Sequence, residues 1–233
     1  DMDIIARGLT QGIRLLLQGD PEVWQITWLT LKISGLATLL AVAAGVPMGI
    51  ALAMGSFRFR RAVVGAVNTG MGLPPTVVGL WVSILLWRSG PLGFLGMMYT
   101  PAAMVIAQTV IALPVVTGFT MASVQQLNPK LKSQILALGA SPAQLWWLII
   151  RECRFGILAA VMAGLGSVIS EVGASMAVGG NVRHYTRVLT TAIVLEVSKG
   201  EFEVAIALSF VLMALSYGAT FALTVLQQRR RRI

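Results

Sequence analysis

The chain has 233 residues, of which 56% are hydrophobic and only 12% are charged. A soluble domain of this size carries roughly twice that charged fraction, about 25%, so this composition argues against a water-soluble globular fold. The single cysteine, Cys153, excludes a disulfide framework. The single histidine, His184, leaves zinc sites and histidine-based catalytic triads with almost nothing to work with.

Charged residues are missing from long stretches of the chain. Apart from Glu171, no Asp, Glu, Lys or Arg occurs in five stretches: 33–57, 62–87, 89–129, 155–182 and 204–228. A hydrocarbon core of roughly 30 Å needs about 20 helical residues to cross it, and each stretch is long enough. The sequence therefore predicts an all-α integral membrane protein with about five spans, at 24–54, 62–87, 102–124, 155–178 and 204–226.

The remaining segments complete one membrane domain. Apolar residues at helical spacing over 4–17 predict an interfacial helix within an N-terminal segment 1–22, because the run is too short to span. Residues 23–228 form the membrane domain, and 229–233 form a basic tail. Cations gather in the predicted loops on the same side as this tail: Arg58, Arg60, Arg61, Lys130, Lys132, Arg151 and Arg154. The positive-inside rule places that side and the C-terminus in the cytoplasm and the N-terminus outside, so the net charge of +9 requires no nucleic acid.

Prolines interrupt three of the predicted spans, at Pro47, Pro74-Pro75 and Pro114. A proline removes a backbone donor, and broken helix inside a membrane is tolerated only where protein buries it or a wet cavity adjoins it. One interpretation is a set of static kinks. The other is that span 62–87 lines a pathway and bends as the pathway opens. Candidate pathway or gate residues are Asn68, Thr69, Met71, Leu73, Pro74, Pro75, Thr76, Ser170 and Glu171.

The loop 125–154, between the third and fourth spans, predicts two short helices joined by a sharp turn. Asn128-Pro129 begins the first helix, as its cap and its first helical residue, and this helix runs to Leu138. Gly139 supplies a left-handed stop. These signals favour a compact helical hairpin on the cytoplasmic side.

Ser141-Pro142 begins the second helix of this loop, and Gln144 completes a capping box. The helix carries Trp146 and Trp147 toward Arg151. A short apolar helix presented to water suits a groove in a soluble partner. An amphipathic helix that rests on lipid headgroups is the alternative.

Residues 136–174 (LALGASPAQLWWLIIRECRFGILAAVMAGLGSVISEVGA) resemble the cytoplasmic coupling loop, and the helix after it, of permease subunits of bacterial ATP-binding-cassette importers. The whole chain resembles the tungstate-transport permeases, in the stretches 19–34, 68–80, 88–101 and 178–208. Molybdate and sulfate permeases share the Leu-Pro-Pro-Thr and coupling-loop features and remain the alternative.

The resemblance implies a type I importer permease fold in the bacterial inner membrane. It also implies three partners: a second copy of the chain, a dimer of cytoplasmic ATPases, and an extracytoplasmic oxyanion-binding protein. Coupling to the ATPase then falls to Leu138, Gly139, Ala140, Ser141, Pro142 and Leu145. Candidate contacts to the binding protein, which could equally be a solvated loop, are Asn181, Arg183 and Arg187.

No catalytic residue, metal or cofactor is expected in this chain. None of its lysines belongs to a Gly-Lys-Ser/Thr phosphate loop, so ATP and Mg would bind to the partner ATPase. A secondary transporter would favour internal repeats and several embedded ionisable residues, and neither is evident. An intramembrane enzyme would need His-Glu-x-x-His, Gly-x-Ser-x-Gly or paired membrane aspartates, which are absent from the sequence.

Glu171 is the one acid deep within a predicted span. An ionised carboxylate at mid-membrane costs roughly 2.5–3.5 kcal/mol, so it should face the bundle interior or water. Because it would repel an oxyanion, we expect it to position structure or a gate, bonded to Ser or Thr of a neighbouring span. A protonatable coupling site is the alternative. Uncharged donors that could guide an anion, or simply join helices, are Asn68, Thr69, Thr76, Ser170 and Asn181.

Overall fold

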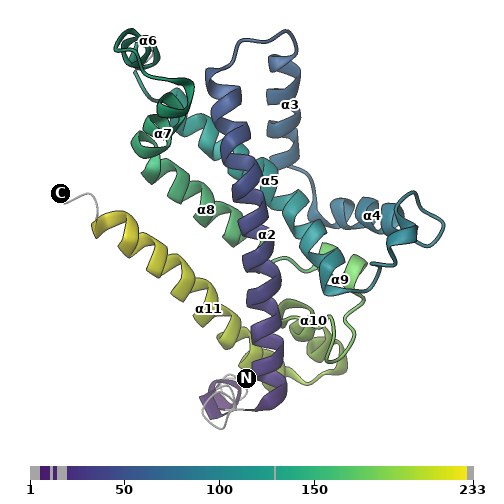
Figure 1. Ribbon diagram of the computed structural model, residues 1–233. Helices are drawn as coiled ribbons and strands as arrows, with labels where there is room; N and C mark the ends of the chain where they lie inside the picture. Colours follow the sequence, from purple (N-terminus) through teal and green to yellow (C-terminus); the bar gives the residue numbers. More distant parts are fainter. Residues whose placement is uncertain (1–5, 11–12, 15–19, 129, 230–233) are drawn as a thin grey trace.

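The computed structural model describes residues 6–10, 13–14, 20–128 and 130–229 (Figure 1). These ranges contain helices and turns and no strand, which confirms the all-α class. Three single helices are long and apolar enough to cross a membrane: α2 (Pro21–Met54), α5 (Pro101–Gln125) and α11 (Phe202–Arg229). Two bent pairs pass the same test: α3 (Arg60–Met71) with α4 (Pro75–Leu86), and α8 (Arg154–Ile169) with α9 (Gly173–Gly179). If each bent pair is one span, the described chain crosses up to five times, in agreement with the sequence.

The bends correct the predicted outlines of two spans. Neither 62–87 nor 155–178 is one continuous helix, because α3 and α4 meet at 107° and α8 and α9 meet at 60°. Pro74-Pro75 explains the first break: neither residue has an N–H, so α3 ends at Met71 and α4 begins afresh with a proline in its first turn. Pro47 and Pro114 lie inside α2 and α5 without ending them.

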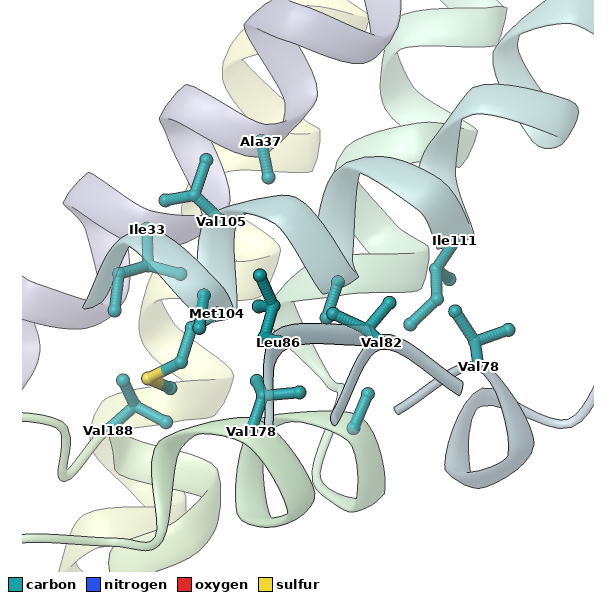
Figure 2. Packing of buried hydrophobic residues seen from close by; sticks show 13 residues of the cluster. Ile33, Ala37, Val78, Val82, Leu86, Met104, Val105, Ile111, Val178 and Val188 are labelled. Atoms are coloured by element: carbon teal, nitrogen blue, oxygen red, sulfur yellow. The ribbon is translucent and has the colours of Figure 1, made fainter. Parts of the chain in front are cut away.

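Helices α2 and α5 form the centre of the bundle. Glycines let them approach closely: a Cβ on Gly49 would lie 2.7 Å from the carbonyl oxygen of Thr117. An apolar cluster continues this contact toward α4 and α9. Figure 2 shows Ile33 of α2, Leu86 of α4, Met104 of α5 and Val178 of α9 converging there, each nearly or fully buried. Helices α4 and α9 are therefore part of the hydrophobic core.

The two ends of the bundle are formed by different helices and loops. One end carries the α2–α3 loop, α6 (Leu131–Ala137) and α7 (Pro142–Glu152) (Figure 1). The other carries the start of α2, α10 (Leu189–Lys199) and the start of α11. A single turn of 3-10 helix (Gly93–Leu95) lies in the loop between α4 and α5. The cations assigned to one side by sequence lie in elements of the α6 end.

Parts of the predicted termini lie outside the described residues. Within the predicted N-terminal helix, residues 6–10 are helical, and Arg7 forms an ion pair of 3.3 Å with Glu203 near the start of α11. Residues 4–5, 11–12 and 15–17 of that helix, Pro129, and residues 230–233 of the basic tail are not among those described.

Candidate translocation and coupling sites

Seven of the predicted pathway residues lie together on the elbow between α3 and α4, which we define as residues 68–76. Its exposed members are Asn68, Thr69, Met71, Leu73, Pro74 and Thr76, whereas Pro75 is half-buried. The side chain of Leu73 is 46% exposed and that of Met71 is 40% exposed. Polar and apolar side chains are thus presented outward from the single chain at a break in a membrane helix, where the backbone needs protein or water beside it.

Close backbone packing brings the elbow against the second break, between α8 and α9. A Cβ on Gly79 of α4 would lie 2.5 Å from the Cα of Ala174 in α9. A Cβ on Gly173 would collide with the side chain of Thr76. The structure therefore places Thr76, at the α4 end of the elbow, beside the break that contains Ser170 and Glu171, which sequence could assign to one pathway only by hypothesis.

Glu171 is buried at this second break, with 7% of its surface exposed. Its Oε1 accepts a hydrogen bond of 2.8 Å from the N–H of Ala174, at the start of α9. Its carbonyl oxygen accepts one of 2.9 Å from the hydroxyl of Thr190. The predicted bond between the carboxylate and a Ser or Thr is therefore wrong. The carboxylate satisfies an otherwise free N–H at the helix start, and the threonine hydroxyl binds the backbone instead.

Two further polar side chains near the break form hydrogen bonds. Ser170 is exposed, and its hydroxyl donates to the carbonyl oxygen of Gly166 at 2.9 Å. Gln108 of α5, which sequence reasoning missed, donates from Nε2 to Oγ of Ser175 at 3.2 Å, and both side chains are buried. A lone glutamine inside an apolar span was the available signal. The Gln108 side chain thereby links α5 to α9 by a hydrogen bond within a mostly apolar part of the bundle.

Replacing Glu171 tests its role at the break. Glu171→Ala leaves the buried N–H of Ala174 without its acceptor, so we expect a loss of about 1–2 kcal/mol in unfolding free energy. Glu171→Gln keeps an Oε1 acceptor and should retain most of that stability. Thermal unfolding in detergent measures the difference. Transport rates should change in both variants, while the preference among oxyanions should not. A changed preference at unchanged stability would contradict the positioning role.

The loop 125–154 forms the predicted hairpin, with one correction. Helix α6 begins at Leu131, later than predicted, and Asn128 bonds the N–H of Lys130 through Oδ1 at 2.9 Å. Gly139 has φ of +80°, which confirms the left-handed stop. At the start of α7, Ser141 and Gln144 bond each other's backbone N–H groups, at 3.3 and 2.7 Å, which confirms the capping box.

The side chains of this hairpin divide into two sets. Leu138, beside the turn, is 88% exposed. Ser141 and Pro142 are exposed, and Ala140 is half-buried. Leu145 is only 6% exposed and packs in the core cluster that includes Val124. Among the predicted coupling residues, Leu145 therefore anchors α7 to the bundle, and the residues around the turn form the outward surface.

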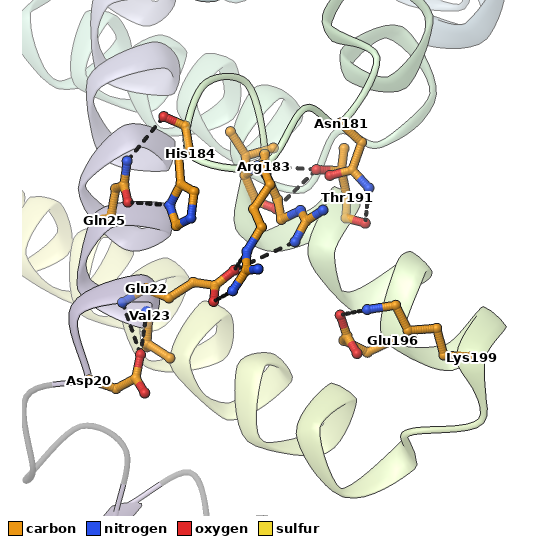
Figure 3. Close-up of polar contacts among 12 residues, drawn as sticks. Asp20, Glu22, Val23, Gln25, Asn181, Arg183, His184, Thr191, Glu196 and Lys199 are labelled. Carbon is orange, nitrogen blue, oxygen red and sulfur yellow. Dashed lines mark hydrogen bonds and ion pairs between the residues drawn. The ribbon is translucent and has the colours of Figure 1, made fainter.

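At the opposite end, Arg183 binds Glu22 of the same chain (Figure 3). Its Nε and Nη2 lie 3.0 and 2.6 Å from the two carboxylate oxygens, and Nη1 of Arg187 lies 3.5 Å from one of them. Hydrogen bonding to Glu22 raises the pKa of the Arg183 guanidinium above its ordinary value. Both arginines are thus already paired with the Glu22 carboxylate of the same chain, although the Arg183 side chain is 61% exposed.

The loop around Arg183 is held to α2 at a second point. Gln25 donates from Nε2 to the carbonyl oxygen of His184 at 3.0 Å, and its Oε1 lies 2.9 Å from Nδ1 of His184. Asn181 has φ of +51° and donates from Nδ2 to the carbonyl oxygen of Thr191 at 3.4 Å. We call these bonds, with the Glu22–Arg183 pair, the outer clamp. Sequence reasoning missed Glu22 and Gln25, because pairing across the whole chain leaves no local pattern.

The chain is 37% identical over 227 residues to the tungstate uptake system permease protein TupB of Peptoclostridium acidaminophilum, covering 97% of this chain and 100% of that protein. It is 34% identical to the protein of the same description in Campylobacter jejuni, covering 94% and 92%. Identity to the molybdenum transport system permease protein ModB of Azotobacter vinelandii is 27%, covering 84% and 90%.

Solved structures share the fold at lower identity. A chain of a bacterial alginate ABC transporter, in complex with its pentasaccharide-bound periplasmic protein, superposes with a TM-score of 0.77 at 17% identity, covering 98% of this chain and 87% of that chain. A chain of the MetNI methionine ABC transporter gives a TM-score of 0.74 at 20% identity, covering 90% and 98%. The fold is therefore that of ABC importer permeases. Residues 45–232 match the model of one family, and the chain belongs to it: the binding-protein-dependent transport system inner membrane components.

Proposed function

We propose that this permease is the membrane subunit of an ATP-driven tungstate importer. The observation that carries the proposal is similarity along nearly the whole chain to two tungstate uptake permeases, at 37% and 34% identity, against 27% for the molybdenum permease. Molybdate and sulfate are the alternative substrates. Glu171 is buried, and its carboxylate caps the start of α9. This agrees with a translocation pathway that contains no exposed acid to repel a dianion.

The exposed elbow supports a pathway formed by two copies of the chain. Asn68, Thr69 and Thr76 present uncharged hydrogen-bonding groups on a surface that this chain leaves uncovered. Such groups cannot remain against lipid without cost. A second copy related by two-fold symmetry would cover them and enclose a polar route between the two elbows.

The hairpin of α6 and α7 is the proposed docking element for a cytoplasmic ATPase dimer, which would bind ATP and Mg. Leu138 projects from a turn that Gly139 and the Ser141 capping box hold in place. A rigid apolar projection of this kind suits a groove in a soluble partner. This assignment places the α6 end and the C-terminus in the cytoplasm and the N-terminus outside.

The outer clamp then faces the extracytoplasmic binding protein. Asn181, Arg183 and Arg187 lie in the loop between α9 and α10, at the end opposite the hairpin (Figure 1), and Arg183 remains largely exposed despite its pair with Glu22. A carboxylate of the binding protein could therefore approach Arg183 without disordering the loop.

Reconstitution tests the proposal directly. The permease is placed in liposomes with its ATPase and the cognate binding protein, and ATP hydrolysis is measured with tungstate, molybdate or sulfate. We expect tungstate to stimulate hydrolysis several-fold above the other two oxyanions at equal concentration. Stronger stimulation by molybdate or sulfate would reassign the substrate. Oxyanion uptake without ATP, by a chain that never co-purifies with an ATPase, would favour a secondary transporter instead.

A further inference from the structure

The loop between α2 and α3 alternates aromatic and cationic side chains. We call residues 55–61, with the sequence Gly-Ser-Phe-Arg-Phe-Arg-Arg, the arginine loop. It separates the charge-free stretches 33–57 and 62–87, so it marks the point where two apolar segments leave the membrane. Its residues therefore lie at the boundary between hydrocarbon and water.

Both kinds of side chain in the arginine loop face outward. Phe57 is 47% exposed and Phe59 is 69% exposed, and Arg58 and Arg61 are exposed as well. Arg60 is half-buried, and its Nε donates to the carbonyl oxygen of Leu52 at 2.7 Å, which fixes the guanidinium against the end of α2. An open hollow of about 530 Å³ lies here, lined by Gly55, Ser56, Phe57, Arg58, Arg60 and Arg61.

No carboxylate of the described residues forms an ion pair with this concentration of positive charge. No Asp or Glu occurs anywhere between Glu22 and Glu152. None of the ion pairs among the described residues includes Arg58, Arg60 or Arg61. Three guanidinium groups gathered without a carboxylate repel one another, and a bound anion would relieve that repulsion.

We infer that the arginine loop binds the headgroup of an anionic phospholipid. Guanidinium groups match phosphate oxygens with paired hydrogen bonds, and an anionic membrane surface attracts clustered cations. The exposed rings of Phe57 and Phe59 favour a lipid over a free oxyanion, because only a lipid offers acyl chains beside its phosphate. Assignment to the cytoplasmic leaflet rests on the orientation proposed above. Binding of the lipid headgroup does not depend on that orientation, because it requires only that this permease lies in a membrane.

Native mass spectrometry of the detergent-purified protein can count the lipids retained. Phosphatidylglycerol, phosphatidylcholine and inorganic phosphate are titrated separately. We expect the wild type to retain phosphatidylglycerol in preference to phosphatidylcholine. The double variant Arg58→Gln/Arg61→Gln should weaken that retention roughly 30-fold, since each cation near an anionic surface strengthens binding about fivefold. Phe57→Ser/Phe59→Ser keeps every charge and should weaken retention as well, because the acyl contact is lost.

A charge-matched control separates this loop from net charge. Arg14→Gln/Arg88→Gln removes two exposed cations from other regions and should retain phosphatidylglycerol like the wild type. Equal retention by the Arg58→Gln/Arg61→Gln variant would overturn the inference. Displacement of phosphatidylglycerol by equimolar inorganic phosphate would also overturn it, in favour of a free-anion site. None of these outcomes depends on transport, so failure here leaves the proposed tungstate function untouched.

Discussion

Gly139→Val is expected to separate ATP hydrolysis from transport. Gly139 has φ of +80°, a conformation that costs an L-residue about 1–2 kcal/mol and a β-branched residue at least that much. The equilibrium constant that favours the native turn should therefore fall roughly 5- to 30-fold. Because a Cβ at this position would meet nothing within 4 Å, the effect comes from backbone strain and not from a clash. Tungstate uptake into liposomes should fall, because fewer hairpins hold the docking turn, while basal ATP hydrolysis continues.

Two matched variants make the strain argument specific. Gly139→Asn should be much milder, because asparagine visits the left-handed region more readily than valine. Gly218→Ala, in α11, places a methyl group where nothing lies within 4 Å and should leave uptake unchanged. Retention of tungstate-stimulated hydrolysis and uptake by Gly139→Val would refute the docking assignment, whatever its effect on stability.

Gly79→Val is expected to cause the largest loss of stability of any substitution considered. The added Cβ would lie 2.5 Å from the Cα of Ala174 and 3.0 Å from its Cβ. Since the first of these atoms belongs to the backbone of α9, no rotation of a side chain can relieve the contact, and α4 and α9 must separate. Overpacking costs typically 1–3 kcal/mol, and we expect about 3 kcal/mol here. The melting temperature should fall by roughly 6–12 °C.

The control for this variant is Gly166→Val in α8. A Cβ on Gly166 meets nothing within 4 Å, so the same chemical change should shift the melting temperature little. Gly79→Val should also abolish transport, because Thr76 and the elbow are held in place by the same contact. A Gly79→Val protein that unfolds at the wild-type temperature would show that the packing of α4 on α9 contributes little.

The sequence predicted most reliably those features that depend on local chemistry. Absent charges located the membrane helices, and Ser141 with Gln144 predicted the start of α7, because a cap needs only four neighbouring residues. Pro74-Pro75 predicted an interruption but not its angle of 107°, which depends on how α4 packs against α9. Local pattern also could not show that Leu145 faces inward, since α7 carries apolar residues on more than one side.

The candidate sites were predicted only as separate sets of residues. Thr76 and Glu171 were assigned to one pathway by hypothesis, and only the tertiary structure shows that their two helix breaks adjoin. Arg183 was recognised as an exposed cation, but its partner Glu22 is 161 residues away in sequence. A contact between residues so far apart in sequence depends on how the helices are arranged in space. It therefore cannot be predicted from local patterns in one sequence.

The separation of Glu22 and Arg183 also bears on how the protein is made. The ribosome adds roughly 5–20 residues per second, so some 10–30 seconds pass between synthesis of the two ends of this contact. During that interval the Glu22 carboxylate at the start of α2 has no arginine to pair with. A nascent chain released before Arg183 emerges would therefore have α2 beside α5 but would lack the ion pair that fixes the first turn of α2, which gives membrane proteases a feature that distinguishes unfinished copies from finished ones.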